Sequence, residues 1–277
     1  MGFRIATNTS SLNAQRSLSK MSAKEAKTTA QLASGMRITK SADDSAGLAI
    51  SEKLRANIRS SQQANRNAND GISMIQVAEG GLDESANILI RLRELAIQSA
   101  SDTVGETERS YTDMEYQQLK SEIERISQTT KFNGVGLLDG KADKLDFQIG
   151  SGNNEFQDRI TYNPGDINAG LDALDLGGEG VAHKEDAQSS LEKIDSAINT
   201  VSGQRAQLGA LQNRLMTTSS NLETSAENMA SANSRIRDVD YAEATARNTQ
   251  NNIMKQAGIS VLSQANALPN QALRLLS

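Results

Sequence analysis

Apolar residues recur every seven positions in the second half of the chain, and the positions three residues further on are mostly small or apolar. This is the spacing of the two seam positions of a coiled coil, so it predicts one long helix that packs on partners along its length. The column consists of Ile194, Val201, Leu208, Leu215, Leu222, Met229 and Ile236. No proline interrupts residues 185–240, and at 1.5 Å per residue such a helix would be roughly 80 Å long.

A second, less uniform column predicts another long helix from about residue 45 to residue 101. Its larger apolar members are Leu54, Ile75, Leu82 and Leu89. Glycines at 71, 80 and 81 each cost up to about 1 kcal/mol in a helix interior, so bends are expected there. We expect the two long helices to lie beside one another and to form the inner seam of a helical rod.

Both ends of the chain carry weaker helical patterns, over about residues 10–32 and 241–267. A thin apolar stripe does not offset the entropy lost on ordering a helix, so each end helix needs a partner. We expect the two to pair and to supply contacts between copies of the chain. The residues predicted to make those contacts are Leu12, Leu18, Met21, Leu32, Ile253, Ala257, Val261, Leu262, Ala265 and Leu268.

The middle of the chain has a different pattern. A third helix is indicated around residues 116–130, and alternation at Leu145, Phe147 and Ile149, resumed at Ile160 and Tyr162, predicts a β-hairpin. The glycine-rich and acidic stretch 166–186 is expected to be an exposed loop.

Together these elements predict a mainly α protein. It would be an elongated rod of long antiparallel coiled-coil helices with paired N- and C-terminal helices and a small β-hairpin region in the middle of the chain. The expected parts are an end helix with its linker (1–42), two halves of the helical rod (43–138 and 186–240), a short hairpin and loop region (139–185) and a second end helix (241–277).

Composition narrows the possible functions of the 277 residues. The chain has no cysteine, which excludes disulfides and thiolate chemistry, and its single histidine, His183, excludes a two-histidine metal site. His183 is expected to lie in an exposed loop. The chain lacks HExxH and Walker motifs, and Asp43-Asp44 is better explained as a helix cap than as acid–base machinery. We therefore expect no enzyme activity, no cofactor and no metal.

Charge is unevenly distributed along the chain. Residues 1–40 hold seven basic residues against one acidic, and residues 241–277 hold three against one. Since the net charge is −5, the ends carry +8 and residues 41–240 carry −13. The basic residues are dispersed on helical faces without aromatic partners, so we expect solvated surfaces rather than nucleic-acid binding. No stretch has the length of a membrane span and the N-terminus lacks a secretory signal pattern, so we expect no membrane partner.

Two amphipathic helices and two weakly patterned end helices favour a chain that completes its packing with copies of itself. Repeated head-to-tail contact of this kind builds an open helical filament. An adaptor or sensor would require an input domain, which the sequence does not indicate.

Several segments resemble bacterial flagellin. They are SLNAQRSL near the start, LASGMRITKSADDSAGLAI (32–50), QANRNANDGISMIQVAEGGLDE (63–84), RLRELAIQSA (91–100), FNGVGLL (132–138), LGALQNRL (208–215), ANSRIRDVDYAEA (232–244) and the C-terminal QAGISVLSQANALPNQALRLLS. The resemblance implies end helices that form the inner tube of the filament, a helical layer around it and a variable outer part, here reduced to about 139–185. It also implies end helices that are disordered in the free monomer.

The same resemblance implies location and partners. These are an extracellular filament used for swimming, export unfolded without a cleaved signal peptide, and contacts with the flagellar export apparatus, a chaperone, and junction and cap proteins. It further implies recognition by a vertebrate Toll-like receptor through Arg91, Leu95 and Glu115, although Ile90 departs from the commonly recognised glutamine. The plainer alternative is that Leu95 is a seam residue and Arg91 a solvated one.

Two related alternatives stay open. One is the hook-filament junction protein, which shares terminal patterns with flagellin but matches less closely at both ends. The other is a flagellin-like protein with a catalytic insert, which the short middle and lone histidine disfavour.

Overall fold

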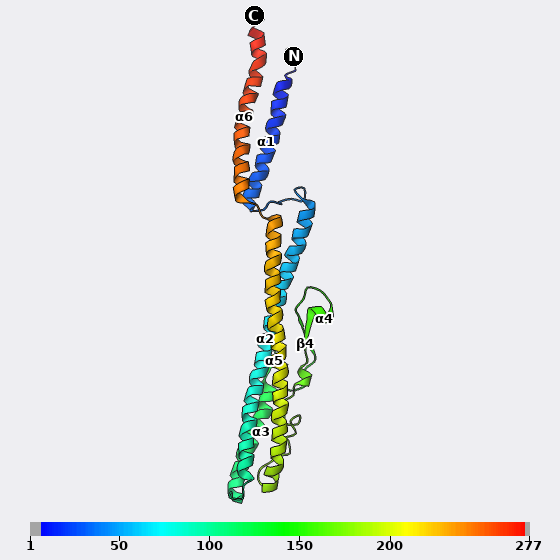
Figure 1. Cartoon of the computed structure of the whole chain (residues 1–277), viewed down its shortest axis with the longest axis vertical. Helices are drawn as coiled ribbons and strands as arrows, with labels where there is room; N and C mark the ends of the chain where they lie inside the picture. The colour runs from blue at the N-terminus through cyan, green and yellow to red at the C-terminus, as the bar shows by residue number, and fades with distance from the viewer. Residues whose placement is uncertain (1–6, 275–277) are drawn as a thin grey trace. The chain divides into compact units, whose positions relative to one another are not determined.

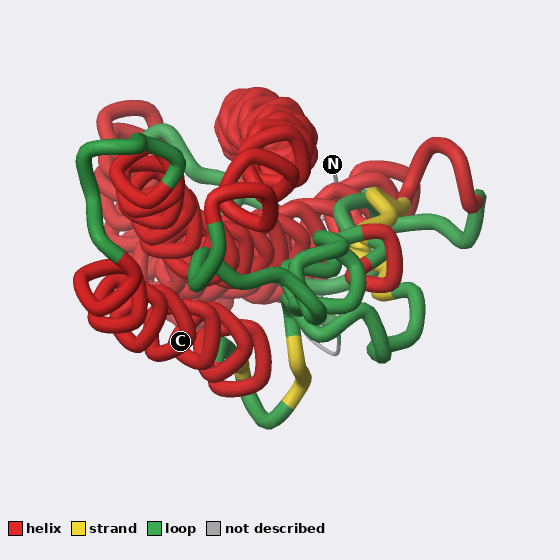
Figure 2. The backbone as a smooth tube through the Cα atoms, turned by 90° about the horizontal axis from the view of Figure 1, so that it is seen from below, coloured by secondary structure: helices red, strands yellow, loops and turns green. Residues whose placement is uncertain are grey.

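The computed structural model describes residues 7–274, and the surroundings of side chains as far as residue 267. Long helices make up most of the chain (Figure 1) and strands take up little of it (Figure 2), so the predicted mainly α class is confirmed. The helices are α1 (Thr9–Ser34), α2 (Ser45–Ser99), α3 (Glu106–Thr129), α4 (Glu155–Asp158), α5 (Lys184–Arg237) and α6 (Tyr241–Arg274), with a 3-10 turn η1 at Pro164–Asp166. The strands are β1 (Lys131–Phe132), β2 (Val135–Gly136), β3 (Leu145–Gln148) and β4 (Arg159–Tyr162).

The chain divides into two compact units, and the boundaries lie inside long helices. The terminal unit comprises residues up to Ala56 together with those from Asn228, and the central unit comprises Asn57–Glu227. The five-part division expected from the sequence places its boundaries elsewhere, at 42 and 240, and stays a prediction.

In the terminal unit α1 and α6 pack along each other, which confirms that the end helices are paired (Figure 1). Asn8 caps α1 by accepting a hydrogen bond from the Ser11 amide at 3.0 Å. Gly35 ends the helix with φ of 70°, a left-handed conformation that a residue with a Cβ adopts at a cost. The linker that follows is fixed to the end of α5, since the Arg37 amide donates to the Arg237 carbonyl at 2.7 Å.

In the central unit one face each of α2, α3 and α5 contributes to a shared apolar core. Two ion pairs, Arg93 with Asp195 and Asp83 with Arg205, join α2 to α5 at 2.6 and 2.9 Å. The residue numbers rise on one helix as they fall on the other, so the two helices are antiparallel, as predicted.

The predicted seam residues divide into two groups. Fully buried in the central core are Ile75, Leu82, Leu89, Ile194, Val201, Leu208 and Leu215. Only half-buried are Leu54, Leu222, Met229 and Ile236. After Leu215, the last fully buried residue of the column on α5, the contacts with α2 become polar. Asn65 of α2 bonds there to Ser219 and Glu223 of α5.

The β-hairpin is where the sequence predicted it, with β3 antiparallel to β4 and Leu145 opposite Tyr162. A smaller hairpin, β1–β2, was not predicted. Its turn residues Asn133 and Gly134 both have positive φ, 48° and 84°, which is the backbone of the Asn-Gly turns that join short antiparallel strands.

The expectation of an exposed loop over 166–186 is wrong in one respect. The segment is irregular, but Leu174, Leu176 and Val181 are buried in the central core. Leu174 and Leu176 are spaced as in a strand, but the alternation does not continue to Val181, so the pattern is too short to predict their burial.

Candidate functional site

The contact between α1 and α6 buries several polar groups beside its apolar side chains. Ser11, Thr28 and Asn251 are its buried polar residues. Thr28 Oγ1 donates to Asn248 Oδ1 at 3.2 Å, and Ser11 Oγ donates to Asn266 Oδ1 at 2.7 Å. The Asn8 amide nitrogen also reaches the Ala265 carbonyl at 2.8 Å, and Lys255 pairs with Glu25 at 2.8 Å.

The larger apolar residues of α6 instead face outward. Ile253 is 62% exposed and Val261 55% exposed, and both share one helix face with Ala257, because residues four apart lie one above the other. Leu12 of α1 is also largely exposed. Ile259 is also 52% exposed, but it lies on another side of α6, because six residues turn a helix by about 240°. It was missed in the sequence, where its spacing falls outside the four-residue series.

The other predicted contact residues occupy varied positions. Leu18, Met21, Leu32 and Leu262 are half-buried, and Ala265 is buried against α1. The side chain of Leu268 lies outside the described residues. In a folded soluble domain most large apolar side chains pack inward, so a helix pair that leaves Leu12, Ile253 and Val261 exposed departs from that arrangement.

The linker between α1 and α2 is held by one carboxylate. Lys27 Nζ lies 2.8 Å from Asp43 Oδ1, and the other carboxylate oxygen accepts from the Thr39 hydroxyl at 2.9 Å and from two backbone amides. The Lys27 ammonium, followed by the Thr39 hydroxyl, holds the pKa of Asp43 well below its usual range. Asp44 Oδ1 accepts from the Gly47 amide at 2.8 Å, so the predicted helix-capping role is confirmed for Asp44, whereas Asp43 holds the linker instead.

A polar cluster in the central unit fixes the buried loop. Lys120 donates to the carbonyls of Gly177 and Glu179 at 3.1 and 2.6 Å. Lys193 of α5 pairs with the Glu179 carboxylate at 2.7 Å. Burial lowers the pKa of Lys120, and it raises the pKa of Tyr116 and of Tyr162 to about 12.

Two of the three predicted receptor residues form an exposed ion pair. Arg91 Nη2 lies 2.9 Å from Glu115 Oε1, and Arg91 Nη1 lies 2.8 Å from Glu94 Oε2. Hydrogen bonds to Glu94 and then to Glu115 raise the pKa of Arg91. Leu95 is only 2% exposed and belongs to the core, as the seam alternative expects, while Ile90 is 51% exposed.

His183 is exposed in the loop before α5, as predicted. Over residues 7–274, no cluster of three or more histidine, cysteine, aspartate or glutamate side chains is placed to hold a metal ion. The helices of that same range include none with the length and apolar character needed to cross a membrane.

Comparison with known protein families accounts for both ends of the chain. Residues 5–143 match the bacterial flagellin N-terminal helical region, and residues 191–276 match the bacterial flagellin C-terminal helical region. The chain belongs to the bacterial flagellin family. The resemblance noted in the sequence is thereby confirmed.

Flagellin relatives match along nearly their whole length. The flagellin of Halalkalibacterium halodurans is 44% identical over 97% of this chain and 98% of its own. The flagellin of Bacillus subtilis is 41% identical over 99% of both chains. The crystal structure of Bacillus cereus flagellin superimposes with a TM-score of 0.51, is 32% identical, and covers 61% of this chain and 94% of that one.

Membership of the flagellin family supports the expected structural role, self-assembly and extracellular location. Flagellins are structural proteins that self-assemble into the extracellular flagellar filament, and the chain is a filament subunit of the compact form expected from its length. The end-to-end matches to flagellins favour this function over a junction protein or a flagellin-like protein with a catalytic insert.

Proposed function

We propose that this flagellin polymerises through α1 and α6, by packing between copies of the chain rather than by bond chemistry, and that it has no catalytic role. The observation that carries the proposal is the exposure of the apolar side chains of Leu12, Ile253, Ile259 and Val261 on a helix pair whose own interface buries polar residues. These four side chains, which point to more than one side of the pair, are together called the outer apolar face below.

The energetics of the pair support assembly as the source of its order. Each hydrogen bond between α1 and α6 adds only about 0.5–1.5 kcal/mol to stability, because the same groups bond to water in the unfolded chain. Ordering the backbone of one residue costs about 1–2 kcal/mol. Burial of the outer apolar face by neighbouring subunits would supply about 1.5–3 kcal/mol for each large side chain fully covered. The end helices are therefore disordered in the free subunit and become ordered in the filament.

The remaining parts of the proposal follow from the family resemblance. Segments 1–42 and 241–277 form the inner tube, 43–138 and 186–240 form the helical layer around it, and 139–185 forms the outer region. The subunit leaves the cell unfolded through the flagellar export apparatus, without a cleaved signal peptide. A chaperone, junction proteins and cap proteins bind it during export and assembly.

Receptor recognition is proposed for the exposed ion pair of Arg91 and Glu115. Leu95 would then act from the core by holding the local shape of α2, since its side chain is covered. Ile90 beside this pair is expected to weaken recognition. Charge reversal at Arg91 should lower receptor activation by the free subunit, and unchanged activation would remove this assignment.

Seeded elongation followed by electron microscopy tests the main proposal. Full-length chain added to preformed seeds should lengthen them, whereas a chain lacking residues 241–277 should stay soluble and leave them unchanged. Ile253→Asp places a charge in the outer apolar face and should also block elongation. Its matched control is Met216→Asp, which introduces the same charge at an exposed apolar residue of the central unit and should still elongate seeds if α6 carries the contact. Normal filaments from the truncated chain would disprove the proposal.

A further inference from the structure

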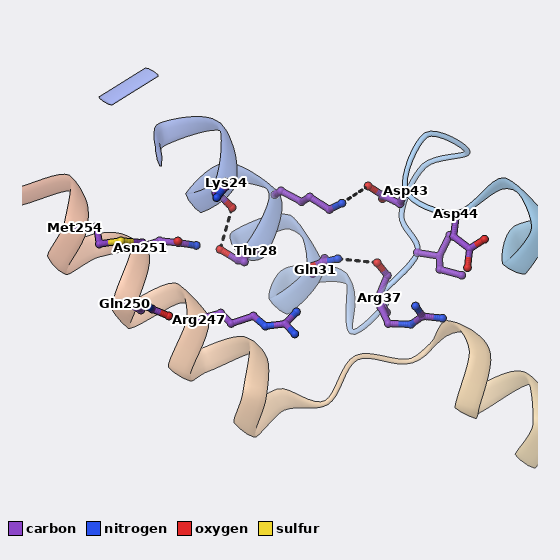
Figure 3. A pocket seen from close by; sticks show the side chains of 12 residues that line it. Lys24, Thr28, Gln31, Arg37, Asp43, Asp44, Arg247, Gln250, Asn251 and Met254 are labelled. Atoms are coloured by element: carbon purple, nitrogen blue, oxygen red, sulfur yellow. Dashed lines mark hydrogen bonds and ion pairs between the residues drawn. The ribbon is translucent and has the colours of Figure 1, made fainter. Parts of the chain in front are cut away.

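A pocket of about 530 Å³ opens at the base of the helix pair, where α1, α6 and the linker meet within the terminal unit (Figure 3). Each helix contributes four residues at the spacing of one face, with Lys24, Lys27, Thr28 and Gln31 from α1. Both helices therefore present polar and basic faces to the same space. We call it the basic pocket.

The acidic groups in the basic pocket are already engaged. Asp43 accepts from Lys27 and from the linker, and one oxygen of Asp44 is occupied by the Gly47 amide. These contacts lie to one side, along the linker, and Figure 3 shows the Asp43 bond there. Among the described residues, the two carboxylates thus form no ion pair with Lys24 of α1, Arg247 of α6 or Arg37 of the linker itself.

Three cations of the basic pocket keep donors available. Among the described residues Lys24 makes no ion pair, and the Arg37 guanidinium donates only to the Ile236 carbonyl, at 2.6 Å. Arg247 shares its charge with Glu243 on an exposed turn of α6, and a guanidinium has five donors. In Figure 3 Arg247 extends from α6 into the pocket, whereas Arg37 runs from the linker toward the end of α5, where its bond to Ile236 lies.

The distribution of charge along the chain indicates what binds there. Residues 1–40 and 241–277 carry +6 and +2, so the end segments of two subunits repel one another, whereas residues 41–240 carry −13. A positively charged pocket on the ends and a negatively charged middle are complementary between copies. An anionic group from the middle of a neighbouring subunit would relieve the repulsion and satisfy the free donors.

We propose that the basic pocket binds an exposed carboxylate from residues 41–240 of a second copy, with Lys24, Arg37 and Arg247 as its donors. This proposal rests on the proposed polymerisation. In the filament, the charged contact would set the alignment of neighbouring subunits, which the outer apolar face alone does not specify. Charge-assisted hydrogen bonds give direction as well as attraction, so the pocket fixes how one subunit is seated on the next.

Charge reversal in the full-length chain tests the pocket. Lys24→Glu and Arg247→Glu should each raise the critical concentration for seeded elongation at least about tenfold at low salt, because a charge-assisted bond is replaced by repulsion. Lys20→Glu is the matched control, since Lys20 is exposed one turn away on α1 and does not line the pocket. Equal effects of Lys20→Glu and Lys24→Glu, or no effect of either, would overturn the proposal.

Two further arms identify the occupant. Reversal of the correct carboxylate in residues 41–240 should restore elongation to Lys24→Glu, and failure of every exposed carboxylate to do so would reject a second copy as the source. Inorganic phosphate at equal ionic strength should affect wild type and Lys24→Glu alike. A selective gain for wild type would assign the pocket to a free anion, while wild type that never elongates seeds would reject polymerisation itself.

Discussion

The two units of the chain are built on opposite principles. The central unit packs leucine, isoleucine and valine of three helices into one buried core. Among the described residues of the terminal unit, the only buried apolar side chains are those of Ile38, Ala244 and Ala265. The difference shows that the chain separates what stabilises one subunit from what joins subunits, since burial missing from the terminal unit has to come from neighbours.

The same substitution in each unit should give the largest contrast. Ile75→Ala removes a fully buried side chain from the central core and is expected to lower the free energy of unfolding by about 2–5 kcal/mol. Ile253→Ala should change it by less than about 0.5 kcal/mol, because that side chain is exposed. Denaturant unfolding of the free subunit measures both.

In assembly experiments, Ile253→Ala should have the larger effect and Ile75→Ala the smaller one. Ile253→Ala is expected to raise the critical concentration for elongation, and Ile75→Ala to leave it unchanged under conditions where the subunit stays folded. Equal effects of the two variants on unfolding would contradict the division of roles between the units.

Alkaline pH should destabilise the central unit selectively. Tyr116 and Tyr162 have folded-state pKa values of about 12, above the ordinary value of 10. Each neutral tyrosine therefore makes its full contribution to the free energy of unfolding below pH 10. As the pH rises toward 12 this contribution is lost, by an amount on the order of 2 kcal/mol per tyrosine. Tyr116→Phe should raise the pH midpoint of alkaline unfolding followed by circular dichroism, and an unchanged midpoint would exclude Tyr116 as a cause.

Removal of one lysine from each unit compares how much their polar contacts contribute to stability. Lys120→Met removes an ammonium that satisfies two carbonyls and should destabilise the central unit by about 1–3 kcal/mol. Lys255→Met breaks a partly exposed ion pair with Glu25 and should cost at most about 1 kcal/mol. Thermal melts of the two variants check the ranking, and a larger shift for Lys255→Met would mean that the α1–α6 pair is stable alone.

Two glycines should give small effects of opposite sign. Gly35→Ala places a Cβ at a φ of 70° and 3.2 Å from the Tyr241 hydroxyl, so the end of α1 should lose about 1–2 kcal/mol. Gly80→Ala meets nothing within 4 Å inside α2 and should stabilise the central unit by about 0.5–1 kcal/mol. Hydrogen exchange resolved by segment measures Gly35→Ala in the filament, where α1 is ordered, and Gly80→Ala in the free subunit. A stabilising Gly35→Ala would show that the left-handed cap is not required.

Regular periodicity made most of the helical fold predictable. The seven-residue columns located Ile194 to Leu215 and Ile75 to Leu89, because a buried helical face repeats in the sequence. The burial of Leu174 and Leu176 could not be predicted, since an irregular loop has no period and its position depends on distant groups such as Lys120. For the candidate site, Ile253 and Val261 were found by spacing, but their outward direction depends on α1.

The buried loop also determines where the subunit tolerates added sequence. Leu174, Leu176 and Val181 fill the core, so a peptide inserted among them would remove core contacts. Residues 151–156 are exposed instead, and their turn is held mainly by Asp158, which accepts from the amides of Gly152 and Asn154. Exposed turns of this kind accept insertions, so a foreign peptide displayed along a filament would be placed within this turn and not in the longer loop.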